Sequence, residues 1–300
     1  MLERFFAESD AQFARIRQHP AQRVPENPLL VLLLFWIVML CAFSAERLVS
    51  WLIFRQHPAL PQTEQLLVFL FRTNIMSVMS ILFCRFIERR PLRTMGLTGR
   101  HGLRDYGRGI LLGLLMFGAV MLTGWAGGAF RFCGTGGISG RLLYFLLAAG
   151  WMMQGFSEEI TFRGWLMMSA GTRSRPLTAV IVSALSFAAA HLQNNGISVL
   201  AFCNVLLFGA VMSLVMLRTD SVWTAAGLHS TWNWAQGSFF GLPVSGIAAG
   251  DSVLLFSQTD RAGWLGGGAF GPESGLAATG VLVIMLLLLI FLPQNRRKIT

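Results

Sequence analysis

Residues 142–171 read LLYFLLAAGWMMQGFSEEITFRGWLMMSAG, a largely apolar stretch whose only charged residues are two acids and an arginine near its middle. About 20 helical residues cross a bilayer, and this stretch is longer than that. A charged side chain at bilayer depth is costly, so it normally faces the protein interior with a partner and a function. The stretch therefore predicts a membrane helix that carries a functional site.

The rest of the chain supports a membrane protein. Of its 300 residues, 54% are hydrophobic and only 13% are charged, about half the charged share of a soluble domain. Gly and Pro within the apolar runs are tolerated in membrane helices. We predict an all-α polytopic fold with about eight transmembrane helices, near residues 29–54, 64–86, 107–126, 142–171, 177–194, 198–217, 221–240 and 276–293.

The distribution of arginine predicts the orientation. The net charge is +10, and with eight spans most arginines fall in loops on the side of the N-terminus, which is typical of the cytoplasmic side. We therefore expect both termini in the cytoplasm, a lipid bilayer as the surroundings, and no nucleic-acid partner. The expected divisions are a cytoplasmic N-terminal segment (1–27), a helical membrane domain (28–293) and a cytoplasmic tail (294–300).

The ionisable residues within the predicted spans are few. Glu159 and Arg163 are four residues apart, so they share a helical face and can pair. Glu158 is rotated by about 100° from Glu159 and has no cation on its own helix, which suits a general base or acid. Arg72, in the second span, and Glu46, near the end of the first, have no role that the sequence defines.

Two further pairs have the same spacing of four residues: Phe187 with His191, and His229 with Asn233. If the fourth helix continues to Gly171, Glu158 lies about 20 Å from the cytoplasmic end, and His191 lies at a similar depth in the next helix. These side chains are then able to meet near the middle of the membrane. We expect the site to open toward the cytoplasm or sideways between helices.

The three pairs together, EExxxR (Glu158, Glu159, Arg163), FxxxH (Phe187, His191) and HxxxN (His229, Asn233), resemble the CAAX-protease and bacteriocin-processing (CPBP) family of intramembrane endopeptidases. The resemblance covers about residues 90–245. Two other stretches, TWNWAQGSFFGLPVSG and GGGAFGPESG, are similar to a bacterial subgroup, which implies a multi-pass protein of the bacterial inner (cytoplasmic) membrane.

The resemblance implies a glutamate-dependent peptidase. Glu158 would deprotonate a water that His191 positions or shares, and His229 and Asn233 would donate to the developing oxyanion. Glu159, Arg163 and Phe187 would support these catalytic residues. No cofactor is favoured, since no HExxH motif is present. The alternative is a divalent metal such as zinc, held by Glu158, His191 and His229.

Other functions stay open. Members of the family that act as non-catalytic membrane scaffolds or regulators would lack Glu158 or His191, and both are present. A proton-coupled transporter would also place Glu and His in its spans, but the inverted repeats typical of transporters are not found. The partner of a peptidase would be a prenylated CAAX tail, a peptide precursor or a membrane-protein tail. The Arg-rich, bacterial character disfavours the prenylated tail, and the sequence does not define an oligomeric state.

Overall fold

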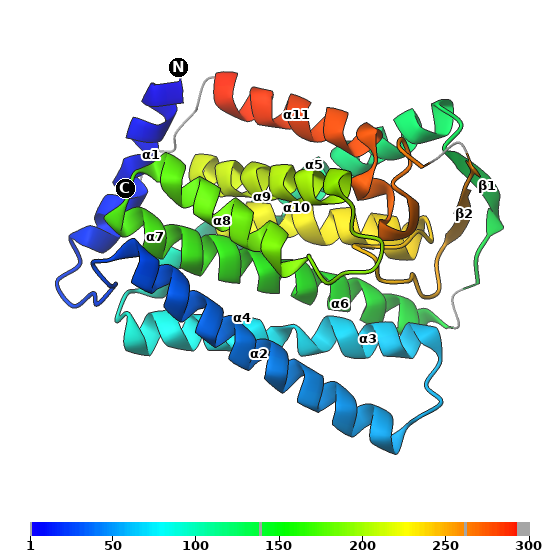
Figure 1. Cartoon of the computed structure of the whole chain (residues 1–300), viewed down its shortest axis with the longest axis horizontal. Coiled ribbons are helices and arrows are strands. Elements are labelled where there is room, and N and C mark those ends of the chain that lie inside the picture. The colour runs from blue at the N-terminus through cyan, green and yellow to red at the C-terminus, as the bar shows by residue number, and fades with distance from the viewer. Residues whose placement is uncertain (1, 138–139, 261–262, 293–300) are drawn as a thin grey trace.

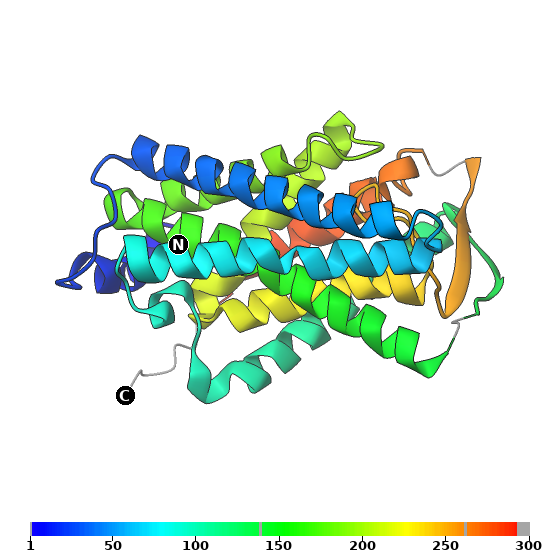
Figure 2. The same cartoon turned by 90° about the horizontal axis from the view of Figure 1, so that it is seen from below.

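The computed structural model describes residues 2–137, 140–260 and 263–292 of the chain. It is mostly helical, and its helices run roughly side by side along the long axis of the molecule (Figures 1 and 2). The α-helices are α1 Leu2–Arg17, α2 Pro28–Gln56, α3 Gln62–Arg72, α4 Asn74–Leu82, α5 Gly102–Ala126, α6 Arg141–Glu159, α7 Met168–Arg173, α8 Pro176–Ala190, α9 Val199–Thr219, α10 Val222–Trp234 and α11 Leu276–Phe291. The predicted tail 294–300 lies outside the described residues.

Each of the eight expected helices is present as a helical stretch. Among the described residues, four helical stretches are long and apolar enough to cross a membrane: Pro28–Gln56, Gln62–Ile87, Gly102–Ala126 and Val199–Thr219. Two shorter apolar helices, Pro176–Ala190 and Leu276–Phe291, accompany them. The chain is therefore a multi-pass membrane protein, while a total of eight crossings and the cytoplasmic placement of both termini stay predictions.

Short π-helical and 3-10 segments interrupt or join the longer helices. The π-helical segments are η1 Phe83–Ile87, η4 Ile160–Met167 and η5 Ala235–Phe239, and the 3-10 segments are η2 Leu92–Met95, η3 Gly99–His101, η7 Gly268–Phe270 and η8 Pro272–Ser274. With η4 between them, α6 and α7 form the continuous fourth helix that the sequence predicted, extending to Arg173. Such π segments occur often at functional sites, because they change the direction in which side chains point.

Two features were not predicted from the sequence, and the first of them departs from the all-α expectation. Strands β1 (Phe130–Thr135) and β2 (Leu254–Gln258) form an antiparallel pair at the end of the molecule away from α1 (Figure 1). The N-terminal segment 1–27 contains α1, whose Phe5, Phe13 and Ile16 are buried against the bundle. Neither segment contains an apolar run as long as a membrane span. Both are held by contacts with distant parts of the chain.

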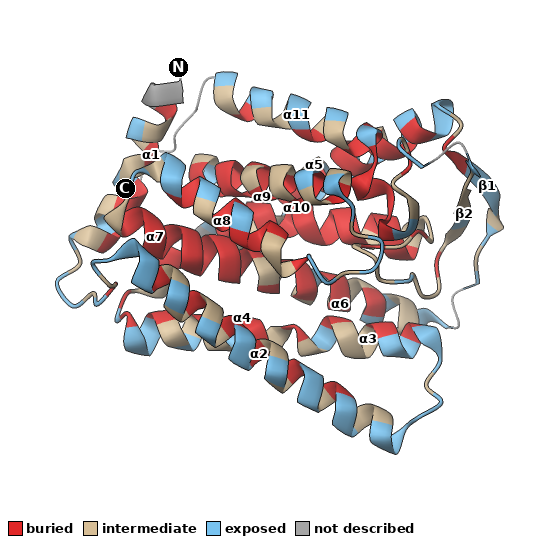
Figure 3. Cartoon of the chain, viewed as in Figure 1, coloured by how far each residue is buried: buried red, intermediate tan, exposed pale blue. Residues whose placement is uncertain are grey.

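Burial divides the bundle into a central and a peripheral part. Helix α10 and the segment from α6 to α7 are buried along most of their length, whereas α2 and α11 expose many apolar residues (Figure 3). Leu29, Leu33 and Leu40 of α2 are more than half exposed. Exposed leucines in this number are expected where lipid, and not water, surrounds a helix.

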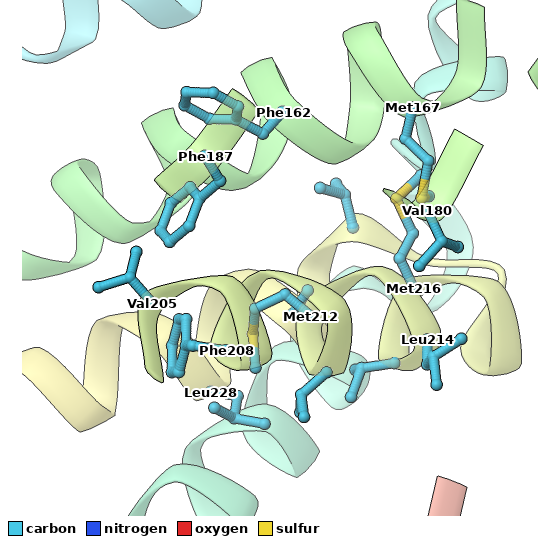
Figure 4. Close-up of a cluster of buried hydrophobic side chains, with 14 of the residues drawn as sticks. Phe162, Met167, Val180, Phe187, Val205, Phe208, Met212, Leu214, Met216 and Leu228 are labelled. Atoms are coloured by element: carbon cyan, nitrogen blue, oxygen red, sulfur yellow. The ribbon is translucent and has the colours of Figure 1, made fainter. Parts of the chain in front are cut away.

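The core lies between the central helices. Phe162 from η4, Phe187 from α8 and Phe208 from α9 are buried together, beside Met212 and Leu228 (Figure 4). Helix α10 packs closely against α5 because small residues face each other, and a Cβ added at Gly227 would lie 2.3 Å from the Tyr106 carbonyl oxygen. Such contacts between small residues let membrane helices approach one another. The packing holds α10, with His229 and Asn233, at the centre of the bundle.

Candidate active site

The structure brings the three motif pairs together. Glu158 and Glu159 are the last residues of α6, Arg163 lies in η4, and His229 and Asn233 lie on α10. Contact between α6 and α10 depends on Gly155, where an added Cβ would lie 2.5 Å from Ser230 Oγ. A larger residue there would push α10, and with it His229, away from the two glutamates.

His229 lies between the two adjacent glutamates. Its Nδ1 is 2.8 Å from Glu159 Oε1, and its Nε2 is 3.5 Å from Glu158 Oε2. The same Glu159 oxygen accepts a hydrogen bond of 3.0 Å from Arg163 Nη1, and the side chains of this ion pair are fully buried. The ion pair that the sequence predicted is therefore present, and its glutamate also contacts the imidazole of His229.

Glu158 faces a cavity of about 200 Å³, and its side chain is 15% exposed while that of Glu159 is fully buried. The lining of this catalytic cavity includes Phe43, Glu46, Trp151, Glu158, His191, Asn194, Asn233 and Val244. Of the two adjacent glutamates, Glu158 is thus the one that a water or a substrate can reach.

Gln154 is a site residue that the sequence reasoning missed. Its Nε2 donates to Glu158 Oε1 at 2.7 Å, and its Oε1 accepts from Asn233 Nδ2 at 3.0 Å. The amide thereby fixes the orientation of both Glu158 and Asn233. A signal was available, because Gln154 precedes Glu158 by four residues and is a polar residue on the same face of an apolar helix.

His191 lines the catalytic cavity, and one of its ring nitrogens is held by the backbone. Its Nδ1 is 2.8 Å from the Phe187 carbonyl oxygen, which can only accept, so Nδ1 carries the hydrogen. In the neutral ring Nε2 is then an acceptor. Helix α8 ends at Ala190, not at 194 as expected, so His191 is the residue that caps it.

Phe187 connects the ion pair to this histidine. The Arg163 guanidinium carbon lies 4.3 Å from the centre of the Phe187 ring, and the ring lies 4.7 Å from that of His191. A cation over an aromatic face is stabilised by the ring quadrupole. Phe187 therefore contacts Arg163 with its ring and also packs beside both imidazoles.

Glu273 is a second residue that the sequence reasoning missed. It lines a small cavity of about 30 Å³ together with His191, His229 and Asn233. Its Oε1 accepts from the backbone N–H and, at 2.7 Å, from the hydroxyl of Ser245. Burial raises the pKa of Glu273 from its ordinary value of 4.5 to about 7, although the hydrogen bonds of Ser245 lower it.

The Glu273–Ser245 contact holds a loop over the site. Ser245 has φ of +49°, and with Gly246 it forms a two-residue turn closed by Val244 and Ile247. A left-handed serine is strained, and the bonds to Glu273 offset that strain. Segments 191–198 and 240–253 lie at the end of the bundle away from α1 (Figure 1), and Asn194 and Val244 line the catalytic cavity. The cavity is therefore lined in part by these two segments, while its opening toward the cytoplasm or sideways between helices stays a prediction.

A metal site is not evident from the donor geometry. In residues 2–137, 140–260 and 263–292, no group of three or more His, Cys, Asp or Glu side chains is arranged to hold a metal ion. Glu158, His191 and His229, the ligands of the zinc alternative, lie near one another. His229 Nδ1 is already engaged by Glu159, so only its Nε2 would be available.

The structure thus gathers a buried set of acids, histidines and an amide within a bundle of membrane helices. A family model described as Type II CAAX prenyl endopeptidase Rce1-like matches residues 140–235. Over this segment the resemblance to the CPBP family is confirmed, and all of the motif residues fall within it. The match supports a membrane endopeptidase of the CAAX-protease type. A search of curated proteins gave no match.

Proposed function

We propose that this protein is an intramembrane endopeptidase that cleaves a peptide or a protein tail with a water activated by Glu158. The observation that carries the proposal is the difference between the two adjacent glutamates. Glu159 is buried and paired with Arg163 and His229. Glu158 lines the catalytic cavity, with His229 Nε2 at 3.5 Å and no arginine or lysine in ion-pair contact among the described residues. A base must reach its water, and only Glu158 does.

The steps follow from the donors and acceptors around the catalytic cavity. A water between Glu158 and His191 donates to the Glu158 carboxylate and to His191 Nε2. Glu158 takes the proton as the water attacks the scissile carbonyl, and later gives it to the leaving amine. Glu159 accepts from His229 Nδ1–H and so holds the ring with its Nε2 at 3.5 Å from Glu158 Oε2, beside the catalytic cavity.

His229 and Asn233 would stabilise the oxyanion. One N–H of the Asn233 amide donates to Gln154, and the second N–H is available to a substrate. Preorganised donors of this kind are worth about 3–4 kcal/mol each in acyl transfer. The proposal needs no Lewis acid, and zinc held by Glu158, His191 and His229 is the alternative that metal analysis would test.

The substrate is proposed to be a peptide precursor or the tail of a membrane protein, with a prenylated CAAX tail as the less favoured alternative. Exposed apolar surface on α2 and α11 fits a substrate that arrives within the bilayer. We further propose a bacterial inner membrane as the location, with eight crossings and both termini in the cytoplasm. No observation favours the scaffold or the transporter.

The test is cleavage by purified protein in liposomes. Wild type and Glu158→Gln are incubated with a library of synthetic single-span peptides, and the products are identified by mass spectrometry. Wild type is expected to cleave a subset, while Glu158→Gln cleaves none although its yield and thermal midpoint are unchanged. No cleavage by wild type, or equal cleavage by both proteins, would overturn the proposal.

A further inference from the structure

The catalytic cavity contains a second carboxylate that the proposed mechanism does not use. Glu46 of α2 lines the cavity from the side of the peripheral helices, while Glu158 lines it from α6. Figure 1 shows α2 crossing outside α4, where few other elements cover it. Glu46 therefore belongs to a part of the wall that a substrate entering from the bilayer would pass.

Glu46 has the surroundings of a binding group and not of a structural one. The residue is only 6% exposed, and among the described residues its Oε1 has no hydrogen-bond partner. A buried carboxylate in a membrane protein normally has a cation or several donors. The structural acid Glu88, by comparison, has donors at both oxygens. The unsatisfied oxygen at a cavity wall indicates that a ligand supplies the missing donor.

Arg72 is the nearest cation, but it is directed elsewhere. It acts on Glu46 electrostatically, yet within the described part of the chain the two do not come within ion-pair distance. Its guanidinium donates to Ser50 Oγ, one turn beyond Glu46, and lies 5.1 Å from the Phe69 ring. Arg72 is not part of the cavity lining, so it leaves the Glu46 carboxylate available there.

The charge and shape of the cavity favour a basic side chain. Its described lining holds Glu46 and Glu158 and neither lysine nor arginine, so a cation is attracted and a carboxylate repelled. Aromatic rings of Phe43, Phe69 and Trp151 lie in the same wall. These suit the methylene stem and the charged end of arginine or lysine, which pack well on aromatic faces.

We propose that Glu46 forms a subsite that binds an arginine or lysine side chain of the substrate close to the cleaved bond. The inference rests on the proposed peptidase function and adds the substrate class, peptides with a basic residue at a fixed distance from the scissile bond. Glu46 determines specificity and takes no part in proton transfer. A free substrate carboxylate next to the cleaved bond is correspondingly disfavoured.

The experiment uses the same liposomes and a peptide library in which the positions around the cleaved bond are varied among Arg, Lys, Gln and Glu. Wild type is expected to prefer a basic residue at one position by about tenfold or more, the size of one charged hydrogen bond. Glu46→Gln should lose this preference with little change for the Gln peptides, and Glu46→Arg should prefer Glu. Glu64→Gln, an exposed acid on α3, is the matched control. A preference that persists in Glu46→Gln would overturn the proposal.

A binding measurement separates this proposal from the peptidase itself. Acetyl-arginine amide is compared with its neutral isostere acetyl-citrulline amide, and the thermal midpoint of the protein is recorded. Wild type and the inactive Glu158→Gln should be stabilised by the arginine compound only, and Glu46→Gln by neither. If wild type cleaves no peptide but this difference holds, the subsite stands and the peptidase fails. Equal shifts with both compounds would overturn the subsite whatever the activity.

Discussion

Two buried ion pairs involve η4, and they differ in how completely their donors and acceptors are hydrogen-bonded. In the Glu88–Arg90 pair, Arg90 donates to Glu88, Thr94 and the carbonyls of Gly164 and Trp165, and Glu88 also accepts from Ser169. In the Glu159–Arg163 pair, Glu159 Oε2 and Arg163 Nε have no partner among the described residues. Glu159 Oε1, which accepts from Arg163, also contacts His229 Nδ1.

Under the proposed function, the difference separates a structural ion pair from one that supports catalysis. Glu88 and Arg90 join the segment after η1 to the fourth helix, and every strong donor and acceptor is used within the fold. Glu159 and Arg163 each keep an atom without a hydrogen-bond partner among the described residues, and they lie beside His229, whose ring is close to Glu158. A network that is only partly satisfied costs stability, and in the proposed mechanism this pair holds His229 beside Glu158.

The largest expected effect is on the structural pair. Glu88→Gln leaves Arg90 buried without its counter-charge, which should destabilise the fold by about 3–5 kcal/mol. The measurement is the yield of folded protein and its thermal midpoint in detergent. The double variant Glu88→Leu with Arg90→Met should lose less than the single variant, because no charge stays unpaired. A single variant as stable as wild type would remove the distinction between the two pairs.

Glu273 differs from both glutamates in these ion pairs, because the hydrogen bonds to its buried carboxyl group come from Ser245 and not from a cation. Its pKa is raised from 4.5 to about 7 by burial, so between these values the folded protein binds more protons than the unfolded chain. Stability should therefore fall as pH rises from about 4.5 to about 7, by about 3 kcal/mol for this group, and level off above that. The thermal midpoint is measured across this range. Glu273→Gln should remove this part of the slope, and an identical slope in the variant would contradict the assignment.

A smaller effect is expected where Phe187 holds Arg163. Phe187→Leu removes the aromatic face under the guanidinium, 4.3 Å away, and should lower kcat about tenfold with little change in KM, corresponding to a cation–π contact worth about 1–2 kcal/mol. Phe13→Leu, a fully buried phenylalanine of α1, is the control for lost packing. Equal losses of kcat in both variants would mean that Phe187 acts only through the core.

The smallest effect is expected from chelation. Protein purified in detergent and treated exhaustively with a chelator should retain its activity, because Glu158 supplies the activated water without a Lewis acid. Metal content is measured in parallel. Stoichiometric zinc, with activity that returns only when zinc is restored, would assign Glu158, His191 and His229 as ligands instead.

The sequence predicted what depends on local periodicity. Apolar runs located the helices, and the spacing of four residues paired Glu159 with Arg163, as the structure confirms. The continuation of the fourth helix to Gly171 was also correctly predicted from the need to bring Glu158 and His191 to one depth, and the structure extends it to Arg173.

What the sequence did not predict depends on contacts between distant segments. Glu273 reaches the site only because the loop after α10 folds back, and Ser245 holds it there. The pairing of β1 with β2 joins segments more than 100 residues apart. Arg90 belongs to an arginine-rich stretch that reads as a cytoplasmic loop, yet its side chain is fully buried. The periodicity of apolar residues within one segment does not predict which distant segments come into contact.

The most direct test of the central claim is the activity of Glu158→Gln against that of Glu159→Gln, measured on one cleaved peptide with matched amounts of folded protein. The account predicts no detectable cleavage by Glu158→Gln, because the base is lost. Glu159→Gln should retain reduced but measurable cleavage, because Glu158 keeps its place in the cavity while His229 loses part of its support. Cleavage by Glu158→Gln, or complete loss in Glu159→Gln alone, would show that the roles of the two glutamates are reversed.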